Sequence, residues 1–140
     1  MNNFRLVIAD DDPAIRQILR DLAENLGAQV LAEADNGRVA IEHVQRLQPN
    51  VLFLDVSMPV MGGFPAARFL REHQPELSII IISQYQQKAC AEEALQLGAK
   101  AYVTKGSLVT DLGPAIETVL AGGTFVSPRA RNGTAGTRTP

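Results

Sequence analysis

Three short runs of the chain are apolar at every position, and they restrict the fold more than any other feature of the sequence. The runs are LVIA at 6–9, VLFL at 51–54 and IIII at 79–82. A strand with one face in water alternates apolar and polar side chains, whereas a strand covered on both faces stays apolar throughout. The runs therefore predict parallel strands that lie between two layers of helices.

The spacing of these runs predicts the topology of the sheet. Strands are expected at 4–9, 28–34, 51–54, 77–82 and 100–104, with helical patterns between them. Strands that alternate with helices through right-handed crossovers form a doubly wound sheet, and five strands fit the flavodoxin-like order 2-1-3-4-5. The predicted fold class is thus an α/β, (βα)5 domain in which the first and third strands are neighbours.

Local signals bound four of the five expected helices. Asp12 is the predicted N-cap of the first helix, Pro13 lies in its first turn and Gly27 follows its end. The second helix is expected over 36–47, the third after Gly63 and the fourth over 87–97.

The last helix, expected within 107–121, contains Pro114. A proline inside a helix removes one backbone hydrogen bond and clashes with the preceding turn. A regular helix that starts late, with Asp111 as its N-cap, places Pro114 in the first turn and leaves 106–110 as a loop. Positions 128–140 lack apolar periodicity, so a single domain over 1–127 with a linker-like or disordered tail is expected.

Composition excludes several classes of protein. A formal net charge of −2 argues against direct nucleic-acid binding, because domains that bind nucleic acid usually carry a basic excess. Three acids at 10–12 interrupt the first apolar run, so neither an export signal nor a membrane span is expected there. The lone Cys90 fits a cytoplasmic protein, and neither Cys90 nor the distant His43 and His73 suggests a functional role.

Chemically capable side chains follow four of the five predicted strands. They are Asp10, Asp11 and Asp12 after the first, Asp55 after the third, Ser83 after the fourth and Lys105 after the fifth. Clustered carboxylates repel one another unless a cation is present, and Mg²⁺ prefers oxygen ligands. A carboxylate beside such an ion can attack phosphorus, while a lysine offsets the charge of the phosphoryl oxygens. The set therefore predicts Mg²⁺-dependent phosphoryl chemistry.

Simpler interpretations exist for single members of this set. Asp12 is better explained as a helix cap than as a ligand. Ser83 could satisfy backbone groups at the end of a strand, and Tyr102 could equally be a half-buried strand residue with its hydroxyl in water. Lys105 alone would be an ordinary surface lysine. Only the combination favours chemistry.

Four motifs resemble those of response-regulator receiver domains, in the same order and at the expected strand ends. They are LVIADDDP, LFLDVSMPVMGG, IIISQY and GAKAYVTK, and the resemblance covers the chain to about Pro128. It implies that Asp55 accepts a phosphoryl group from a sensor histidine kinase. It also implies a phosphorylated switch rather than an enzyme, with at most slow self-phosphorylation and autodephosphorylation.

The resemblance assigns further roles to individual residues. It implies that Asp11, Asp55 and the backbone carbonyl of Ser57 bind Mg²⁺, and that Asp10 acts through metal-bound water. It pairs Lys105 with the phosphate. It makes Ser83 and Tyr102 a switch pair that transmits phosphorylation to the face formed by the fourth helix, the fifth strand and the fifth helix.

The segments GAKAYVTKGS and AIETVLAGGTFVSP resemble the NarL/FixJ subfamily, whose members usually continue into a helix-turn-helix domain that binds DNA. Control of transcription through a C-terminal domain outside this sequence is therefore expected, and homodimer formation is left open. Two rivals remain. Gly62 and Gln84 depart from the family pattern and encourage an unphosphorylated pseudo-receiver, whereas a phosphatase of the haloacid dehalogenase kind would use Asp10 as its nucleophile.

Overall fold

Each continuously apolar run forms a buried strand of a central parallel sheet in the computed structural model, which describes residues 3–131. The strands are β1 Phe4–Ala9, β2 Ala28–Ala34, β3 Val51–Asp55, β4 Ser78–Ser83, β5 Ala101–Thr104 and β6 Phe125–Val126. Their order is β2-β1-β3-β4-β5-β6, and every pair is parallel. The predicted fold and strand order are confirmed, and a sixth short strand extends the sheet.

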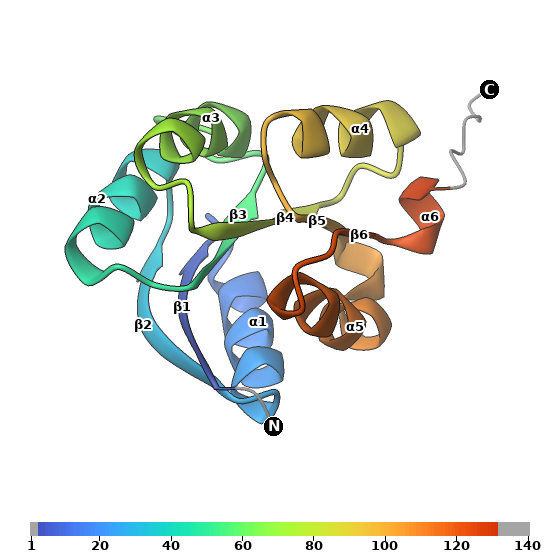
Figure 1. Cartoon of the computed structure of the whole chain (residues 1–140), viewed down its shortest axis with the longest axis horizontal. Helices are drawn as coiled ribbons and strands as arrows, with labels where there is room; N and C mark the ends of the chain where they lie inside the picture. Colours follow the sequence, from blue (N-terminus) through green and yellow to red (C-terminus); the bar gives the residue numbers. More distant parts are fainter. Residues whose placement is uncertain (1–2, 132–140) are drawn as a thin grey trace.

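Helices cover both faces of this sheet (Figure 1). They are α1 Pro13–Asn25, α2 Gly37–Leu47, α3 Gly63–His73, α4 Lys88–Gln96, α5 Leu108–Leu120 and the single turn α6 Pro128–Arg131, and a 3-10 turn, Lys105–Ser107, precedes α5. Helices α2, α3 and α4 lie on one face, and α1 and α5 lie on the other. No helix within residues 3–131 is long and apolar enough to cross a membrane.

Strand β3 shows why its sequence is apolar without alternation. Leu52 and Leu54 pack into the core under α2, α3 and α4, whereas Val51 and Phe53 pack into the core under α1 and α5. Successive side chains of a strand point to opposite faces, and here both faces are covered. Every position of the strand therefore meets an apolar core.

The predicted start of α1 agrees with the structure. The Asp12 carboxylate accepts a hydrogen bond of 2.9 Å from the backbone N–H of Ala14, and Pro13 opens the helix. This cap satisfies one of the free N–H groups at the helix start and fixes the direction in which the chain leaves β1.

The predicted late start of the last helix is wrong. Helix α5 begins at Leu108, so Asp111 lies inside it and Pro114 occupies its interior. The buried side chains of Leu108 and Leu112 explain the difference, because they pack into the core under α1 and α5. Burying a leucine contributes about 1.5–3 kcal/mol, and an interior proline costs about 3 kcal/mol. Packing of the first turns therefore offsets the proline.

The segment after α5 joins the sheet through β6, which the sequence analysis did not predict. Ser127 donates its backbone N–H to the carbonyl of Tyr102 (2.8 Å), and its hydroxyl accepts from the backbone N–H of Thr104 (3.0 Å). Both bonds satisfy the outer edge of β5. Helix α6 follows, with Ala130 fully buried, whereas positions 132–140 of the expected tail lie outside the described residues. The domain boundary at 127 stays a prediction.

Candidate functional site

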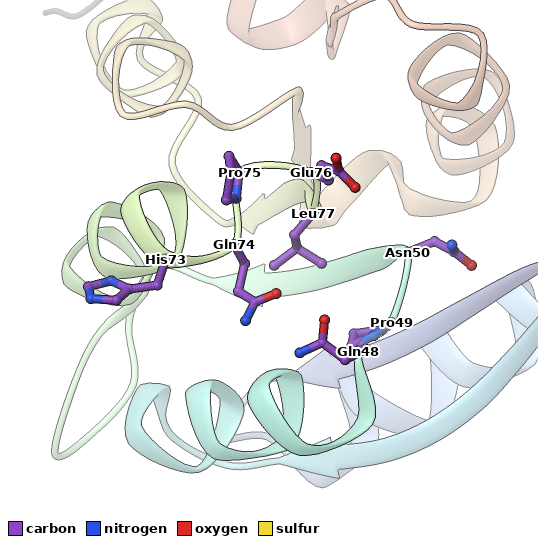
Figure 2. Close-up of a pocket in the computed structure, with 8 residues that line it drawn as sticks. All are labelled: Gln48, Pro49, Asn50, His73, Gln74, Pro75, Glu76 and Leu77. Atoms are coloured by element: carbon purple, nitrogen blue, oxygen red, sulfur yellow. The ribbon is translucent and has the colours of Figure 1, made fainter.

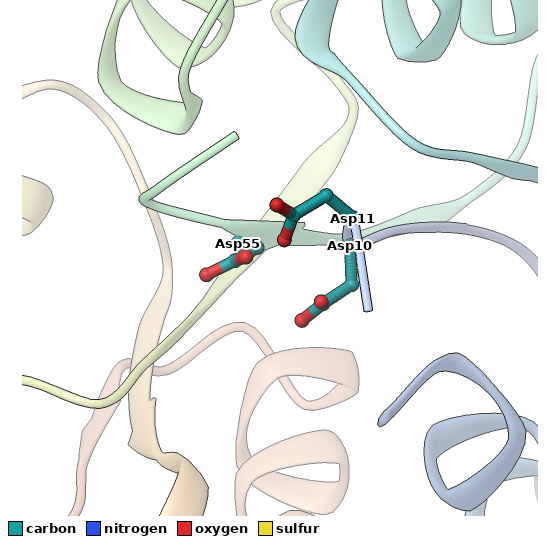
Figure 3. A group of neighbouring side chains, drawn as sticks. All are labelled: Asp10, Asp11 and Asp55. Atoms are coloured by element: carbon teal, nitrogen blue, oxygen red, sulfur yellow. The ribbon is translucent and has the colours of Figure 1, made fainter. Parts of the chain in front are cut away.

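The ends of β1 and β3 lie side by side, and this places the first acidic residues next to Asp55. Ala9 pairs with Leu54 in the parallel register, so the residues that follow them leave the sheet together. One carboxylate oxygen from each of Asp10, Asp11 and Asp55 lies within 4.8 Å of the others (Figure 3). Two adjacent strands thus supply a compact group of three carboxylates.

A single lysine approaches two of these carboxylates from the end of β5. The Nζ atom of Lys105 lies 3.1 Å from Oδ2 of Asp10 and 3.3 Å from Oδ1 of Asp55. Asp10 is fully buried and Asp55 is 3% exposed. One positive charge therefore faces two buried carboxylates, with the third, on the exposed Asp11, close by.

This imbalance of charge appears in the acidity of Asp55. Burial, together with repulsion from Asp10, raises the pKa of Asp55 to about 6, although Lys105 and the backbone N–H of Ser57 partly oppose the rise. Burial lowers the pKa of Lys105, but its interactions with Asp10 and Asp55 outweigh burial and leave that pKa raised. The lysine stays positively charged while the carboxylates lack a full counter-charge.

The same group of oxygens fits a hard divalent cation. Oδ1 of Asp10 accepts a hydrogen bond of 2.9 Å from the backbone N–H of Asp12, and the buried Oδ2 pairs with Nζ of Lys105 at 3.1 Å. Lys105 also pairs with Asp55, so one lysine faces two buried carboxylates, and a cation with oxygen ligands would offset the remaining negative charge. Asp10, Asp11 and Asp55 can therefore hold a divalent cation.

A pocket of about 340 Å³ opens over Asp55. It is lined by Asp11, Asp12, Asp55, Ser57, Ser83, Gln84 and Lys105. The sequence analysis expected most of these residues at the site, and the pocket now brings four strand ends and their loops together. Asp10 is not among the lining residues, so Asp55 is the buried carboxylate that a ligand in the pocket can reach.

Ser83 and Tyr102 both contact the backbone of Tyr85, which lies in the loop before α4. The Ser83 hydroxyl accepts from the Tyr85 N–H (3.0 Å), and the Tyr102 hydroxyl donates to the Tyr85 carbonyl (2.8 Å). Tyr102 is fully buried, and burial raises its pKa to about 12, so the phenol stays neutral. The alternative interpretation of Tyr102, a half-buried strand residue with its hydroxyl in water, is wrong, because the ring is buried and the loop supplies an acceptor for the hydroxyl.

Sequence reasoning missed Arg16, which touches the acidic group from the first turns of α1. Its Nη1 donates to the backbone carbonyl of Asp10 (2.7 Å), and its Nε donates to the carboxylate of Glu33 (3.0 Å). The one signal in the sequence was its place four residues after the helix cap. That spacing alone says nothing about a contact with Asp10.

A second hollow lies at the opposite ends of the strands (Figure 2). This amino-end hollow measures about 410 Å³ and is lined by Gln48, Pro49, Asn50, His73, Gln74, Pro75, Glu76 and Leu77. Its residues come from the loops that lead into β3 and β4 and from the last residue of α3. None of the residues that the sequence singled out for chemistry lines it.

Known proteins match this chain over most of its length. The family described as response regulator receiver domain matches residues 6–117. Response regulator GacA of Pseudomonas viridiflava is 33% identical over 127 residues, which are 90% of this chain and 59% of that protein. The chemotaxis protein CheY of Thermotoga maritima is 36% identical over 101 residues, which are 72% of this chain and 84% of that protein.

Solved structures agree with the sequence relatives. A two-component response regulator of the LuxR family from Aurantimonas sp. superposes with a TM-score of 0.90 at 33% identity, and 96% of each chain is covered. The isolated receiver domain of RcsB from Salmonella enterica serovar Typhimurium, solved in the presence of the phosphomimetic BeF3-, gives a TM-score of 0.80 at 28% identity over 94% of this chain and 98% of that one. The family model, the sequence relatives and the solved structures agree. The chain, with its carboxylates at the ends of β1 and β3, belongs to the response regulator receiver domain family.

Proposed function

We propose that Asp55 accepts a phosphoryl group and that Mg²⁺, bound by the neighbouring acids, is required for the transfer. The observation that carries the proposal is the meeting of Asp10, Asp11 and Asp55 beside the single cation of Lys105. Phosphoryl transfer depends on positioning and on neutralising negative charge, and this arrangement supplies both. The phosphomimetic in the RcsB structure supports the same chemistry in a related domain.

The residues fit Mg²⁺ in the following way. Asp11, Asp55 and the backbone carbonyl of Ser57 would bind the ion directly, and Asp10 would act through a bound water molecule. Mg²⁺ would offset the negative charge of the carboxylates and of the phosphoryl oxygens. Asp10, whose buried Oδ2 shares Lys105 with Asp55, would gain a second positive partner from this arrangement.

In the transfer itself, a carboxylate oxygen of Asp55 attacks phosphorus and forms an acyl phosphate. The bond between phosphorus and its donor breaks, and the donor leaves with the bonding electron pair. Lys105, held 3.3 Å from Asp55, would pair with a phosphoryl oxygen. The Ser83 hydroxyl lines the same pocket and would donate a hydrogen bond to another. Asp10 is buried outside the pocket, which favours Asp55 over Asp10 as the nucleophile.

Ser83 and Tyr102 would report phosphorylation through the backbone of Tyr85. If the Ser83 hydroxyl turns toward a phosphoryl group, it releases the N–H of Tyr85, whose carbonyl is tied to Tyr102. The loop before α4 then moves relative to β5, which would change the face formed by α4, β5 and α5. A shift from 1:99 to 99:1 needs about 5.5 kcal/mol of differential stabilisation, within reach of a few charge-assisted hydrogen bonds.

The partners follow from the family. The chain spans about 59% of the length of GacA. We propose a sensor histidine kinase as the phosphoryl donor and a C-terminal DNA-binding domain, outside this sequence, as the output. Control of transcription would then pass through that domain, whereas this segment would not contact DNA directly.

Intact-mass measurement tests the proposal. With acetyl phosphate and Mg²⁺, the wild-type chain should gain the mass of one phosphoryl group, and Asp55→Ala should gain none. Asp12→Asn is the matched control, because Asp12 lines the same pocket but caps α1, and it should still be modified. An adduct that persists in Asp55→Ala, or a wild type that gains no mass, would overturn the proposal. Steady hydrolysis of a phosphomonoester that depends on Asp10 would indicate a phosphatase instead.

A further inference from the structure

Arg16 ties the acidic residues after β1 to two other elements. One end of its guanidinium donates to the Asp10 carbonyl and the other to Glu33 on β2 (2.7 and 3.0 Å). Arg16 itself belongs to α1, and Glu33 lies beside Ile8 of β1 in the sheet register. The side chain therefore joins the end of β1, the end of β2 and the first turns of α1.

The position of Asp11 depends on this backbone. No hydrogen bond holds the Asp11 side chain in the described part of the chain, so the main chain on either side of it sets the direction in which the side chain leaves the backbone. That main chain is held at three points: the Asp10 N–H bonds Ala34 (3.0 Å), the Asp10 carbonyl bonds Arg16, and the Asp12 N–H bonds the Asp10 carboxylate. The carbonyl bonded by Arg16 belongs to the peptide unit that leads directly into Asp11.

We propose that Arg16 is a positioning residue for the Mg²⁺ site, which holds the peptide between Asp10 and Asp11 so that the Asp11 carboxylate faces Asp55. The proposal rests on the Mg²⁺-binding role proposed above. Residues that orient metal ligands through hydrogen bonds change metal affinity by about 10- to 100-fold when they are removed. Because its own contact is with a backbone carbonyl, Arg16 acts on the ion only through Asp11.

The charge of Arg16 and its positioning contact have opposite effects on Mg²⁺ affinity. A positive side chain near a cation site repels the cation, so removing that charge by itself would tighten Mg²⁺ binding. Removing a positioning contact would weaken it, because Asp11 would then sample orientations away from Asp55. The two interpretations predict opposite directions for the same substitution.

A Mg²⁺ titration of three variants, monitored through backbone amide NMR shifts, distinguishes the charge effect of Arg16 from its positioning effect. In Arg16→Met the Mg²⁺ dissociation constant should rise by about 10-fold, and Arg16→Lys should show a similar rise, because lysine keeps the charge but cannot bridge Asp10 and Glu33. Arg20→Met is the matched control. Arg20 also binds Glu33, at 2.7 Å, and carries the same charge, but its hydrogen-bond partners are Glu33 and Glu24. Its dissociation constant should stay within about twofold of wild type.

Phosphorylation by acetyl phosphate provides the second readout. At saturating Mg²⁺ the Arg16 variants should react within about threefold of the wild-type rate, whereas at limiting Mg²⁺ they should lag by about the loss in affinity. Unchanged or tighter Mg²⁺ binding in Arg16→Met and Arg16→Lys would overturn the role of Arg16, and so would an equal loss in Arg20→Met. If the variants give these results while the wild type binds Mg²⁺ and is phosphorylated, only the role of Arg16 is overturned and the proposed function stands. A wild type that neither binds Mg²⁺ nor is phosphorylated would overturn both the proposed function and the role of Arg16.

Discussion

The two ends of the parallel sheet each carry a hollow, and the smaller one holds the candidate site. The amino-end hollow measures about 410 Å³, and the pocket over Asp55 measures about 340 Å³. They differ in how well their polar groups are satisfied. At the carboxyl end, the buried carboxylates of Asp10 and Asp55 share one lysine, and the pKa of Asp55 is raised to about 6. A buried carboxylate with a raised pKa indicates a functional site, whichever hollow has the larger volume.

At the amino end, polar side chains are used to hold the fold together. Asn50 accepts from the backbone N–H of Arg5 (2.7 Å), and the Arg5 guanidinium donates to the carbonyls of Gln48 (2.5 Å) and Leu47 (2.7 Å). The ring of His73 stacks on Phe69 with centroids 3.9 Å apart. The guanidinium of Arg5 thus satisfies carbonyls at the end of α2, and the charged side chains at this end, Arg5 and Glu76, are exposed and not buried. The comparison predicts that substitutions at the two ends affect different properties.

The largest expected effect is on phosphorylation at limiting Mg²⁺. Asp11→Asn removes a charged ligand from the carboxyl end and should slow phosphorylation by acetyl phosphate by at least about 100-fold, the upper range for changes around a metal ligand. Glu76→Gln removes one carboxylate from the rim of the amino-end hollow and should leave the rate unchanged. The measurement is the rate of mass gain by intact-mass spectrometry. An equal loss in both variants would show that net charge, rather than position, controls the reaction.

The next effect is on stability, and we expect a gain, because the buried, ionised Asp55 destabilises the folded state. Without Mg²⁺, Asp55→Asn should raise the free energy of unfolding at pH 7.5 by about 1–3 kcal/mol, since each unit of pKa shift corresponds to about 1.4 kcal/mol. The folded-state pKa of about 6 lies above the ordinary 3.8, so the folded protein binds this proton more tightly than the unfolded chain. Stability therefore falls as pH rises from about 4 to about 6.

Urea unfolding in the presence of a chelator measures this difference. The gain from Asp55→Asn should be present at pH 7.5 and should shrink toward pH 4.5, where wild-type Asp55 is largely protonated in the folded state. Added Mg²⁺ should stabilise the wild type more than the variant. A gain that does not change with pH would mean that charge repulsion at Asp55 is not its cause.

A smaller, opposite effect is expected at the amino end. Arg5→Met removes the hydrogen bonds to the carbonyls at the end of α2 and should lower the free energy of unfolding by about 1 kcal/mol. Phosphorylation should not change, because the site lies at the other end of the sheet. Arg5→Lys, which keeps a positive charge at the helix end, should recover part of the loss. Slower phosphorylation of a folded Arg5→Met would contradict the separation of roles.

Sequence reasoning succeeded where local rules determine the structure. The continuous apolar runs predicted buried strands, and the order of the strands followed from the alternation with helices. The same topology predicted that acids after the first and third strands would meet, and it placed Asp11 beside Asp55 without any knowledge of distances. The cap of α1 at Asp12 follows from the chemistry of one side chain and its neighbours.

The features that were missed depend on partners that are distant in the sequence. Strand β6 exists because Ser127 reaches the backbone of β5, and two residues are too short for a periodic signal. Helix α5 starts early because Leu108 packs into the core. The sequence analysis considered the cost of Pro114 but not the stabilisation from burying Leu108. The bond from Arg16 to the Asp10 carbonyl likewise requires that α1 already lies on the sheet. Strand β6, the start of α5 and the Arg16 hydrogen bond all depend on tertiary packing.

The smallest effect concerns two strained residues, one at each end of the sheet. Among the described residues other than glycine, Gln48 (φ 53°) and Val60 (φ 67°) have a positive φ. Val60 is β-branched and 76% exposed, so little packing compensates its strain, whereas the Gln48 side chain donates to the Gln45 carbonyl (3.0 Å).

The left-handed conformation costs an L-residue about 1–2 kcal/mol, which glycine avoids. Glycine also increases the entropy of the unfolded chain, which lowers the gain in stability by about 0.5–1 kcal/mol. In urea unfolding, Val60→Gly should therefore gain about 0.5 kcal/mol, whereas Gln48→Gly should gain nothing because it loses its hydrogen bond. Equal gains would show that the two ends carry the same strain, and a loss in Val60→Gly would show that the valine side chain stabilises the loop after Asp55.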